Sequence, residues 1–484
     1  MWYCKIHSRR ITSHSSETLI IKHKQNQIIM KKNLLVIGIG FLLIGASIFS
    51  ACTKEGPMGP AGADGTNGTN GTNGTNGTNG VNGGTNCQQC HNPATVELAA
   101  TQYEFSKHSY GEAAFGESGN ISCSPCHASE AFQYVVKNNI PVAFVENTTT
   151  HKWTNPYATI ATASIGEITC VTCHSSLHTT FSTADLPALT TVAPVAMTYN
   201  GGKQVIDLPA DSHISNLCVK CHQPRPFTNS NTNGNVLNYD SLKNFPNVVF
   251  YDAAQANGLN KIKPSYRMHT HYGTVGAIVA GKGGIEFSGT AAYENSIHAT
   301  IAACQDCHMA TQTGRAGGHT FVAKGNLSGC NKTGCHSGLT STSVLFAGTQ
   351  TAAKTALDAL AAKLKVGGID IMNRNPDATT NLWPTQTTNK YDGYLNVYDP
   401  INNPNGIANN VAGGGTFQNP GSTSSWTQAQ KDINTALPKL ILTNAQMGAI
   451  INFQLCLREY SLGIHNTKYT MALLNNTIAA LSAK

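Results

Sequence analysis

The sequence predicts a mostly irregular body with short α-helices, a helical C-terminal part and little β-structure. Charged residues make up only 12% of the 484 residues and apolar residues 40%, which is poor material for a large side-chain core. Turn formers are frequent up to about residue 340, as in NSNTNGN at 229–235, and no run long enough for a sheet core alternates steadily. Helical spacing becomes sustained only beyond Phe346. We therefore expect something other than side chains to fill much of the interior.

The C-terminal part, 341–484, is predicted to be helical and to pack on the rest of the body. Three segments carry Ala and Leu at helical spacing: 351–368, which stops at paired glycines; 436–463, which predicts two helices separated near 443–444; and 468–481. Between them, 369–426 is predicted to be a long irregular covering loop. The alternative is a docking surface made by its aromatic residues, Tyr391, Tyr394, Tyr398 and Trp426.

The N-terminal region predicts export from the cytoplasm. Residues 1–29 are basic without periodicity, and we interpret them as upstream read-through before a start at residue 30. MKK then precedes an apolar run over 34–51, which is typical of a signal peptide. A transmembrane anchor is the alternative, because a run of about 18 apolar residues is at the lower limit for a span. Small residues directly before Cys52 are typical of a bacterial lipoprotein signal over 30–52, with Cys52 as the acylated residue.

Residues 53–86 are predicted to form a stalk. A strict Gly-X-Y period begins at Gly56, runs through repeated GTN triplets and closes at Gly83-Gly84. Glycine at every third position is what a collagen triple helix requires, but only Pro57 and Pro60 supply imino acids to stiffen it. A flexible polar spacer between a lipid anchor and the folded body therefore remains the alternative.

Five Cys-x-x-Cys-His motifs follow the stalk, and this spacing is typical of c-type haem attachment. The two thiols form thioethers with one haem, and the adjoining histidine is placed to bind its iron. The motif residues are Cys87, Cys90 and His91; Cys123, Cys126 and His127; Cys170, Cys173 and His174; Cys218, Cys221 and His222; and Cys304, Cys307 and His308. A zinc knuckle or redox dithiol could explain one motif, but five in an exported chain predict haem c. Covalently bound haems would then be the hydrophobic core around which the short helices wrap.

CNKTGCH, at 330–336, raises the question of a sixth site. Four residues separate Cys330 from Cys335, and His336 follows directly. A loop two residues longer can still present both sulfurs and the histidine to one porphyrin, so we predict a sixth haem; a disulfide with an incidental histidine is the alternative. Of the cysteines left over downstream of the signal, Cys456 is predicted to be a small core residue on a buried helix.

Candidate ligands for the second face of each iron come from the other histidines. A haem iron with two protein ligands is confined mainly to electron transfer, whereas one with an open position can bind substrate. From residue 30 onward, nine histidines lie outside the motifs, three more than six irons need. As ligands of the irons, the sequence contexts favour His108, His178, His213, His271, His298, His319 and His465. For His151 and His269 the contexts do not distinguish an iron ligand from a surface or core histidine. Because His178 stands four residues after His174, we expect it to serve the neighbouring haem rather than its own.

Several linked stretches resemble the secreted, outer-surface multihaem c-type cytochromes of bacteria. They are CSPCHASEAF, CVKCHQPRP, HTHYGTVGAIVAGKGG, YENSIH…CQDCHMA…GGHTF…CH and SLGIHNTKYTMALL, within 87–340 and 445–475. A more distant likeness reaches the multihaem nitrite and tetrathionate reductase group. The resemblance implies bis-histidine irons, closely packed haems and His465 as a distal ligand. The Cys-x-x-Cys-Lys motif of the catalytic haem in those reductases is not present in this chain.

Three functions are therefore weighed, and all of them use the haem region at 87–340. The favoured one is electron transfer, not enzymatic, between a membrane or periplasmic donor and an external acceptor, by a lipid-anchored protein of the outer membrane or cell surface that works with other cytochromes. The second is a reductase of small nitrogen or sulfur oxyanions with one open iron. The third is a structural subunit that forms homo-oligomers through its stalk or stacked haems. The net charge of +7 is spread without clusters, so no nucleic-acid partner is expected.

Overall fold

The structure is a computed structural model that describes residues 83–111, 117–160, 166–226, 236–251, 269–366, 369–374, 391–395 and 441–482. The predicted read-through, signal peptide and Cys52 lie outside these residues, as does nearly all of the stalk. Within the described residues, no helix has the length and apolar character needed to cross a bilayer.

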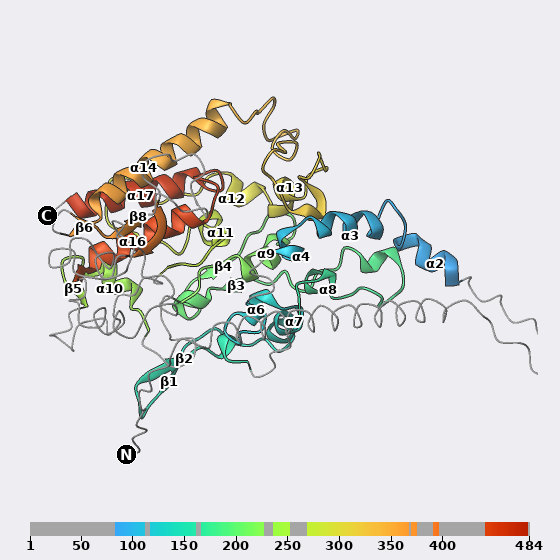
Figure 1. Ribbon diagram of the computed structural model, residues 1–484, viewed down its shortest axis with the longest axis horizontal. Helices are drawn as coiled ribbons and strands as arrows, with labels where there is room; N and C mark the ends of the chain where they lie inside the picture. Colours follow the sequence, from blue (N-terminus) through green and yellow to red (C-terminus); the bar gives the residue numbers. More distant parts are fainter. Residues whose placement is uncertain are drawn as a thin grey trace, which may run out of the picture. The chain divides into compact units, whose positions relative to one another are not determined.

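Short helices make up the part of the chain that carries the motifs (Figure 1). They are α2 (Gly83–Cys90), α3 (Val96–Glu104), α4 (Lys107–Tyr110), α6 (Ser124–His127), α7 (Ser129–Lys137), η1 (Pro156–Ala158), α8 (Cys170–Cys173), η2 (Thr183–Asp185), η3 (Thr198–Asn200), α9 (Ser215–Cys221), α10 (Tyr239–Asn244), α11 (Val275–Val279), α12 (His298–Ile301), α13 (Cys304–His308) and η5 (Gly318–Thr320). Helix α2 includes 83–86, which the sequence assigned to the stalk. The first motif and the end of the Gly-rich segment thus share one helix.

Three long helices form the C-terminal part: α14 (Thr349–Lys363), preceded by the π-helix η6 (Val344–Gly348), α16 (Asn444–Arg458) and α17 (Thr467–Ser482). They lie side by side (Figure 1). Helix α14 ends four residues before the paired glycines that were expected to stop it, because the chain turns at Leu364 into a short strand. Thr443 caps the start of α16: its side chain accepts from the Gln446 N–H, and the Gln446 side chain accepts from the Thr443 N–H. The helix thus begins where the sequence predicted a break, near 443–444.

Strands are few and short, and the described ones pair in five antiparallel two-stranded sheets. The pairs are β1 (Val145–Asn147) with β2 (Lys152–Thr154), β3 (Val195–Ala196) with β4 (Val205–Ile206), β5 (Val249–Tyr251) with β10 (Leu442–Thr443), β6 (Lys365–Val366) with β7 (Ile369–Asp370), and β8 (Met372–Arg374) with β9 (Tyr391–Leu395). The sequence predicted that a helix continues to about residue 443. This prediction is wrong at 442–443, because these residues form strand β10 and pair with β5. Strands β7, β8 and β9 also interrupt the loop expected at 369–426; Tyr398 and Trp426 lie outside the described residues.

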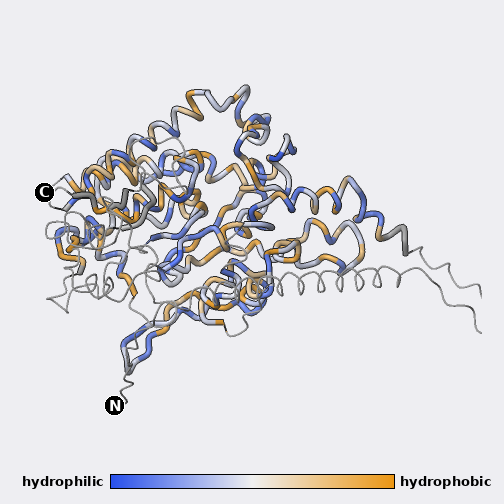
Figure 2. Tube along the Cα trace, viewed as in Figure 1, coloured by the Kyte–Doolittle hydropathy of each residue, from blue (hydrophilic) through white to orange (hydrophobic). Residues whose placement is uncertain are grey.

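A conventional side-chain core lies where the C-terminal helices meet the segment between residues 195 and 287. Figure 2 shows apolar residues recurring along α14, α16 and α17. On α14 the buried residues recur every three or four positions, from Ala353 to Ala361, and Cys456 is buried on α16 as predicted. The expectation that little side-chain core would form is therefore wrong for this part of the protein.

The N-terminal motif region is different. Its described core cluster is small: Ala128, Ala131, Val135, Val142, Tyr157 and Ile160. No residue of the larger cluster comes from the described residues before 195. The first three motifs thus lie on short helices with little side-chain core of their own. The predicted fold class, mostly helical and irregular with little strand, is confirmed at this coarse level.

Candidate functional site

Each of the five Cys-x-x-Cys-His motifs forms a single tight turn. In the first four, the histidine backbone N–H donates to the carbonyl oxygen of the first cysteine, over 2.8 to 3.2 Å. The fifth motif is itself a helical turn, α13. A closed turn of this kind puts both thiols and the imidazole on neighbouring positions of one surface. The local sequence therefore presents all three groups together before any distant contact is made.

The sixth motif closes in the same way despite its longer loop. His336 N–H donates to the Cys330 carbonyl over 3.1 Å, matching the other motifs. The two extra residues are taken up by a turn in which Cys335 N–H bonds to the Lys332 carbonyl, 3.0 Å away. Gly334 sits in this turn at φ +85°, a conformation that residues with a side chain rarely adopt. The longer spacing thus ends in an equivalent presentation of cysteines and histidine.

Every motif histidine faces a second histidine from elsewhere in the chain. The centroid separations and angles between ring planes are 5.8 Å and 14° for His91–His178, 6.0 Å and 67° for His108–His222, 6.2 Å and 49° for His127–His271, 6.4 Å and 40° for His174–His319, 6.0 Å and 79° for His298–His336, and 6.2 Å and 23° for His308–His465. In each pair, one member belongs to a motif and the other does not. His178 faces His91 and not the motif four residues before it.

This separation fits one metal ion held between two imidazoles. Each metal–nitrogen bond is about 2 Å and each ring centre lies about 1 Å beyond its nitrogen, so the two centroids should be about 6 Å apart. The separation is not diagnostic by itself, because the rings of His269 and His271, both outside the motifs, are also 6.4 Å apart. What sets the six pairs apart is that each joins one motif histidine to one histidine outside the motifs. The donor set therefore fits a haem iron with two axial imidazoles, and the paired thiols of each motif fit its covalent attachment.

Hydrogen bonds at the other ring nitrogen orient several of these imidazoles. Backbone carbonyls accept from Nδ1 of His222 (Gly273, 3.1 Å), of His298 (Ile464, 3.0 Å) and of His308 (Phe321, 2.9 Å). With the proton on Nδ1, the Nε2 lone pair is left to bind a metal. His465 differs, because its Nδ1 donates to a carboxylate oxygen of Glu459 over 2.5 Å.

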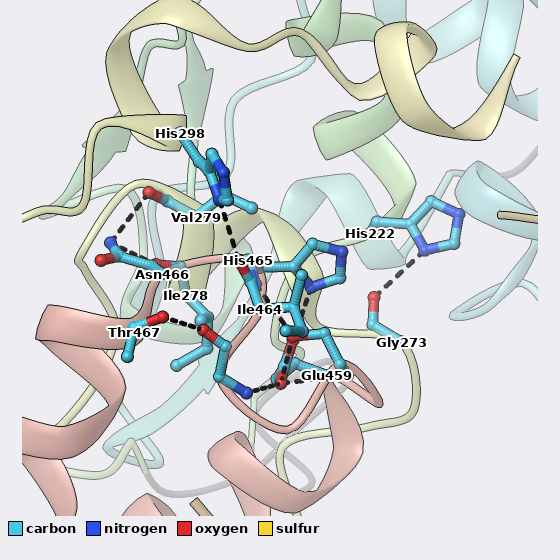
Figure 3. A network of polar contacts seen from close by, with 12 residues as sticks. His222, Gly273, Ile278, Val279, His298, Glu459, Ile464, His465, Asn466 and Thr467 are labelled. Carbon is cyan, nitrogen blue, oxygen red and sulfur yellow. Dashed lines mark hydrogen bonds and ion pairs between the residues drawn. The ribbon is translucent and has the colours of Figure 1, made fainter. Parts of the chain in front are cut away.

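The loop after α16 links three of the six pairs (Figure 3). Gly273 N–H donates to the Arg458 carbonyl, and the Gly273 carbonyl accepts from His222. Further along the same loop, Ile464 accepts from His298 and the next residue, His465, faces His308. These backbone partners belong to no motif, so sequence patterns do not indicate them. The C-terminal helices thus orient histidines that lie far away in sequence.

Burial favours the neutral form and lowers the pKa at five of the paired imidazoles, those of His108, His222, His271, His308 and His319. It lowers the pKa of His108 to about 4 and that of His271 to about 3, with nearby cationic or imidazole groups acting in the same direction. At His465 burial also acts to lower the pKa, but the charge and hydrogen bond of Glu459 outweigh it and the pKa is raised. Neutral imidazole is the form that binds metals.

Exposed apolar side chains flank the paired histidines. Phe105 and Tyr110 lie on either side of His108 in sequence, Phe181 follows His178 and is 62% exposed, and Ile297, next to His298, is 64% exposed. Each of these side chains leaves apolar surface exposed close in sequence to a paired histidine. The apolar faces of a porphyrin held between the paired imidazoles would cover such groups.

Neighbouring sites touch one another. Cysteines of different motifs lie beside one another: Cys221 beside Cys126, Cys218 beside Cys304, and Cys307 beside Cys330. The fourth motif therefore neighbours the second and the fifth, and the fifth neighbours the sixth. The Phe321 ring lies 4.9 Å from His108 and 5.9 Å from His319. This ring therefore lies between the third and fourth pairs. His178 faces His91 of the first motif and stands four residues after His174 of the third motif, so it links the first site to the third. The sites form a connected series.

The remaining histidines are placed elsewhere. His213, which the sequence favoured as a ligand, has its Nδ1 2.7 Å from the Asp207 carboxylate, and its ring is in none of the six pairs. His151 is exposed beside Glu146, and His269 is buried beside Arg225. Over the described part of the chain, no group of three or more His, Cys, Asp or Glu side chains is close enough to hold one metal ion.

Comparison of the chain with protein-family models, with curated proteins and with solved structures found no match.

Proposed function

We propose that this chain is an extracytoplasmic multihaem c-type cytochrome that conducts electrons through six bis-histidine haems. The observation that carries the proposal is the set of six histidine pairs, each with one motif member and a centroid separation between 5.8 and 6.4 Å. Six attachment motifs and six matching distal imidazoles are what six bis-ligated irons require. The resemblance of the linked motifs to bacterial outer-surface cytochromes supports the same function.

The proposed sites are defined by their cysteines and axial histidines. In motif order, they are Cys87, Cys90, His91 and His178; Cys123, Cys126, His127 and His271; Cys170, Cys173, His174 and His319; Cys218, Cys221, His222 and His108; Cys304, Cys307, His308 and His465; and Cys330, Cys335, His336 and His298. His213 is left out of this assignment.

Haem bound at these sites supplies one-electron chemistry at iron. The protein's own residues do the rest. The thiols of each motif would fix a porphyrin to one short turn, and the two imidazoles of each pair would hold its iron. The Nδ1 hydrogen bonds of His222, His298, His308 and His465 hold the orientations of these four rings. With two protein ligands on the iron, little would have to rearrange on electron transfer.

The contacts between sites favour conduction along a defined order. The first site adjoins the third, the third adjoins the fourth through Phe321, and the fourth, fifth and sixth follow through neighbouring cysteines. The second site branches from the fourth through Cys126 and Cys221. Both histidines of the first pair are exposed, whereas His222 is only partly exposed. We propose the first site as one terminal, where a partner protein or acceptor exchanges electrons.

The cellular setting follows from the N-terminal sequence. A lipid anchor at Cys52 and the Gly-X-Y spacer would hold the haem body at the outer membrane or cell surface. Other cytochromes or a membrane donor would supply electrons, and an external acceptor would take them. The stalk or stacked haems could bring copies of the chain together as a homo-oligomer.

Carbon monoxide tests the proposal against the reductase alternative. A reductase of nitrogen or sulfur oxyanions needs one iron with an open axial position. We expect that the reduced protein mixed with carbon monoxide keeps its Soret band unchanged. A shift corresponding to one haem in six would overturn the electron-carrier proposal and favour the reductase.

A further inference from the structure

Glu459 is a buried carboxylate in contact with a proposed iron ligand. It lies at the end of α16, and its side chain is 0% exposed. Its Oε2 is 2.5 Å from His465 Nδ1, and Figure 3 shows the carboxylate directed at that ring. Its Oε1 accepts from Ser461 N–H (3.1 Å), Ser461 Oγ (2.8 Å) and Gly463 N–H (3.3 Å). Both oxygens act only as acceptors, as an ionised carboxylate does.

This arrangement sets His465 apart from the other oriented ligands. Nδ1 of His222, His298 and His308 donates to neutral backbone carbonyls in each case. A carboxylate draws the Nδ1 proton more strongly and makes the imidazole a stronger electron donor at Nε2. In a buried site the effect of the negative charge is also less screened than at the surface.

We propose that Glu459 is a positioning residue that lowers the reduction potential of the iron between His308 and His465. This inference rests on the proposed function. The electron-rich imidazole and the nearby negative charge both favour the ferric over the ferrous state. The hydrogen bond from Nδ1 to Glu459 would keep His465 a neutral ligand through Nε2 in both oxidation states of the iron. Because the fifth site lies between the fourth and the sixth, an electron that reaches it moves on readily to either neighbour.

The test is Glu459→Gln, followed by spectroelectrochemical titration of the haems. Glutamine keeps the size of the side chain and removes its charge. We expect the midpoint potential of one haem in six to become more positive while the other five stay unchanged. The matched control is Glu294→Gln, which removes a surface carboxylate that is 62% exposed and 2.9 Å from Lys468, and it should shift none of them. A Glu459→Gln protein with six haems and unshifted potentials would overturn the inference.

Ser461→Ala gives an independent test in the opposite direction. It removes the hydroxyl that donates to Oε1 of Glu459 (2.8 Å) and that also accepts from the His465 backbone N–H (3.0 Å). An unchanged low-spin EPR signal first shows that His465 still binds; the carboxylate should then act more strongly on His465 and the same haem should shift to a more negative potential. If Glu459→Gln fails to fold, this variant decides the matter: no shift, or a positive one, overturns the inference. Failure of the proposed function is distinct, because it would appear as a haem content below six or as carbon monoxide binding in the unmutated protein.

Discussion

The imidazole planes of His91 and His178 are nearly parallel, with 14° between them, whereas those of His298 and His336 cross at 79°. The relative orientation of two axial imidazoles controls the splitting of the iron d orbitals in a ferric haem. The six proposed sites should therefore not be spectroscopically equivalent.

Low-temperature EPR of the oxidised protein should resolve two classes of low-spin haem. The sites at 14° and 23° should give ordinary rhombic spectra, and those at 67° and 79° should give highly anisotropic spectra with one large g value. His298→Met should remove one highly anisotropic signal and leave the rhombic ones. A single uniform rhombic spectrum from all haems would contradict the pair geometry.

The sixth motif should carry a haem of its own. Replacing Cys330 and Cys335 together with Ser removes both attachment sulfurs, so the haem content per chain should fall by one in six in a pyridine haemochrome assay. Cys456→Ala is the matched control, because this cysteine is buried in the side-chain core and is expected to carry nothing. An unchanged haem content in the double variant would instead favour a disulfide between the two.

His319 and His213 separate a proposed ligand from a histidine outside the pairs. His319→Ala should leave the iron opposite His174 with an open position, so one haem in six becomes high-spin and binds carbon monoxide. His213→Ala removes only a ring bonded to Asp207 and should leave every haem low-spin. The opposite pattern would show that the distal assignment is wrong.

Asp185 should stabilise the loop that carries His178. Its carboxylate accepts from Thr180 N–H (2.9 Å), Thr180 Oγ1 (2.7 Å) and Phe181 N–H (3.0 Å), and these bonds, the Thr180 side chain first, hold the pKa of the carboxyl below its usual value. A carboxyl whose pKa is lowered by folding stabilises the fold above its unfolded pKa, and this contribution is lost as the pH falls through its folded pKa.

Asp185→Asn should therefore make the first haem partly accessible to carbon monoxide at neutral pH, and the difference from the unmutated protein should shrink in acid. Asp240→Asn is the control, since the Asp240 carboxylate is exposed and its contact with Lys243 Nζ is long, at 4.0 Å. Identical carbon monoxide binding by the two variants at neutral pH would contradict this role.

The C-terminal helices should be held by ordinary side-chain packing. Leu473 on α17 is fully buried, so Leu473→Ala should lower the free energy of unfolding by about 2–5 kcal/mol. Leu345→Ala, at a side chain 68% exposed, should change it by less than about 0.5 kcal/mol. Denaturant unfolding followed by far-ultraviolet circular dichroism measures both. Equal effects would show that Leu473 does not pack as described.

The attachment half of each site is readable from sequence because it is local. The proposed attachment would need two cysteines on one turn, with a histidine next to them for the iron, so the spacing itself indicates these residues. Even CNKTGCH closes the same hydrogen bond as the shorter motifs. The opposing half is not local: His178 and His91 are 87 positions apart. His213 stands close before a motif, yet the fold directs it to Asp207. Sequence contexts could rank the candidates but could not pair them.

The core shows the same limit. Helical periodicity predicted α14 and α17 to within a few residues, because each presents a regular apolar face. The overall apolar fraction suggested a poor core, since it averages turn-rich stretches with the apolar helices at 444–482. Glu459 carries no sequence signal at all; only its burial and its contact with His465 reveal it.

Near-infrared magnetic circular dichroism of the oxidised protein, calibrated against total haem, tests the central claim most directly because it identifies the axial ligands of low-spin haems. The histidine pairs predict six haems per chain, all with the charge-transfer band of bis-imidazole ligation. A folded protein without haem, or one in which any haem lacks that band, would contradict the account.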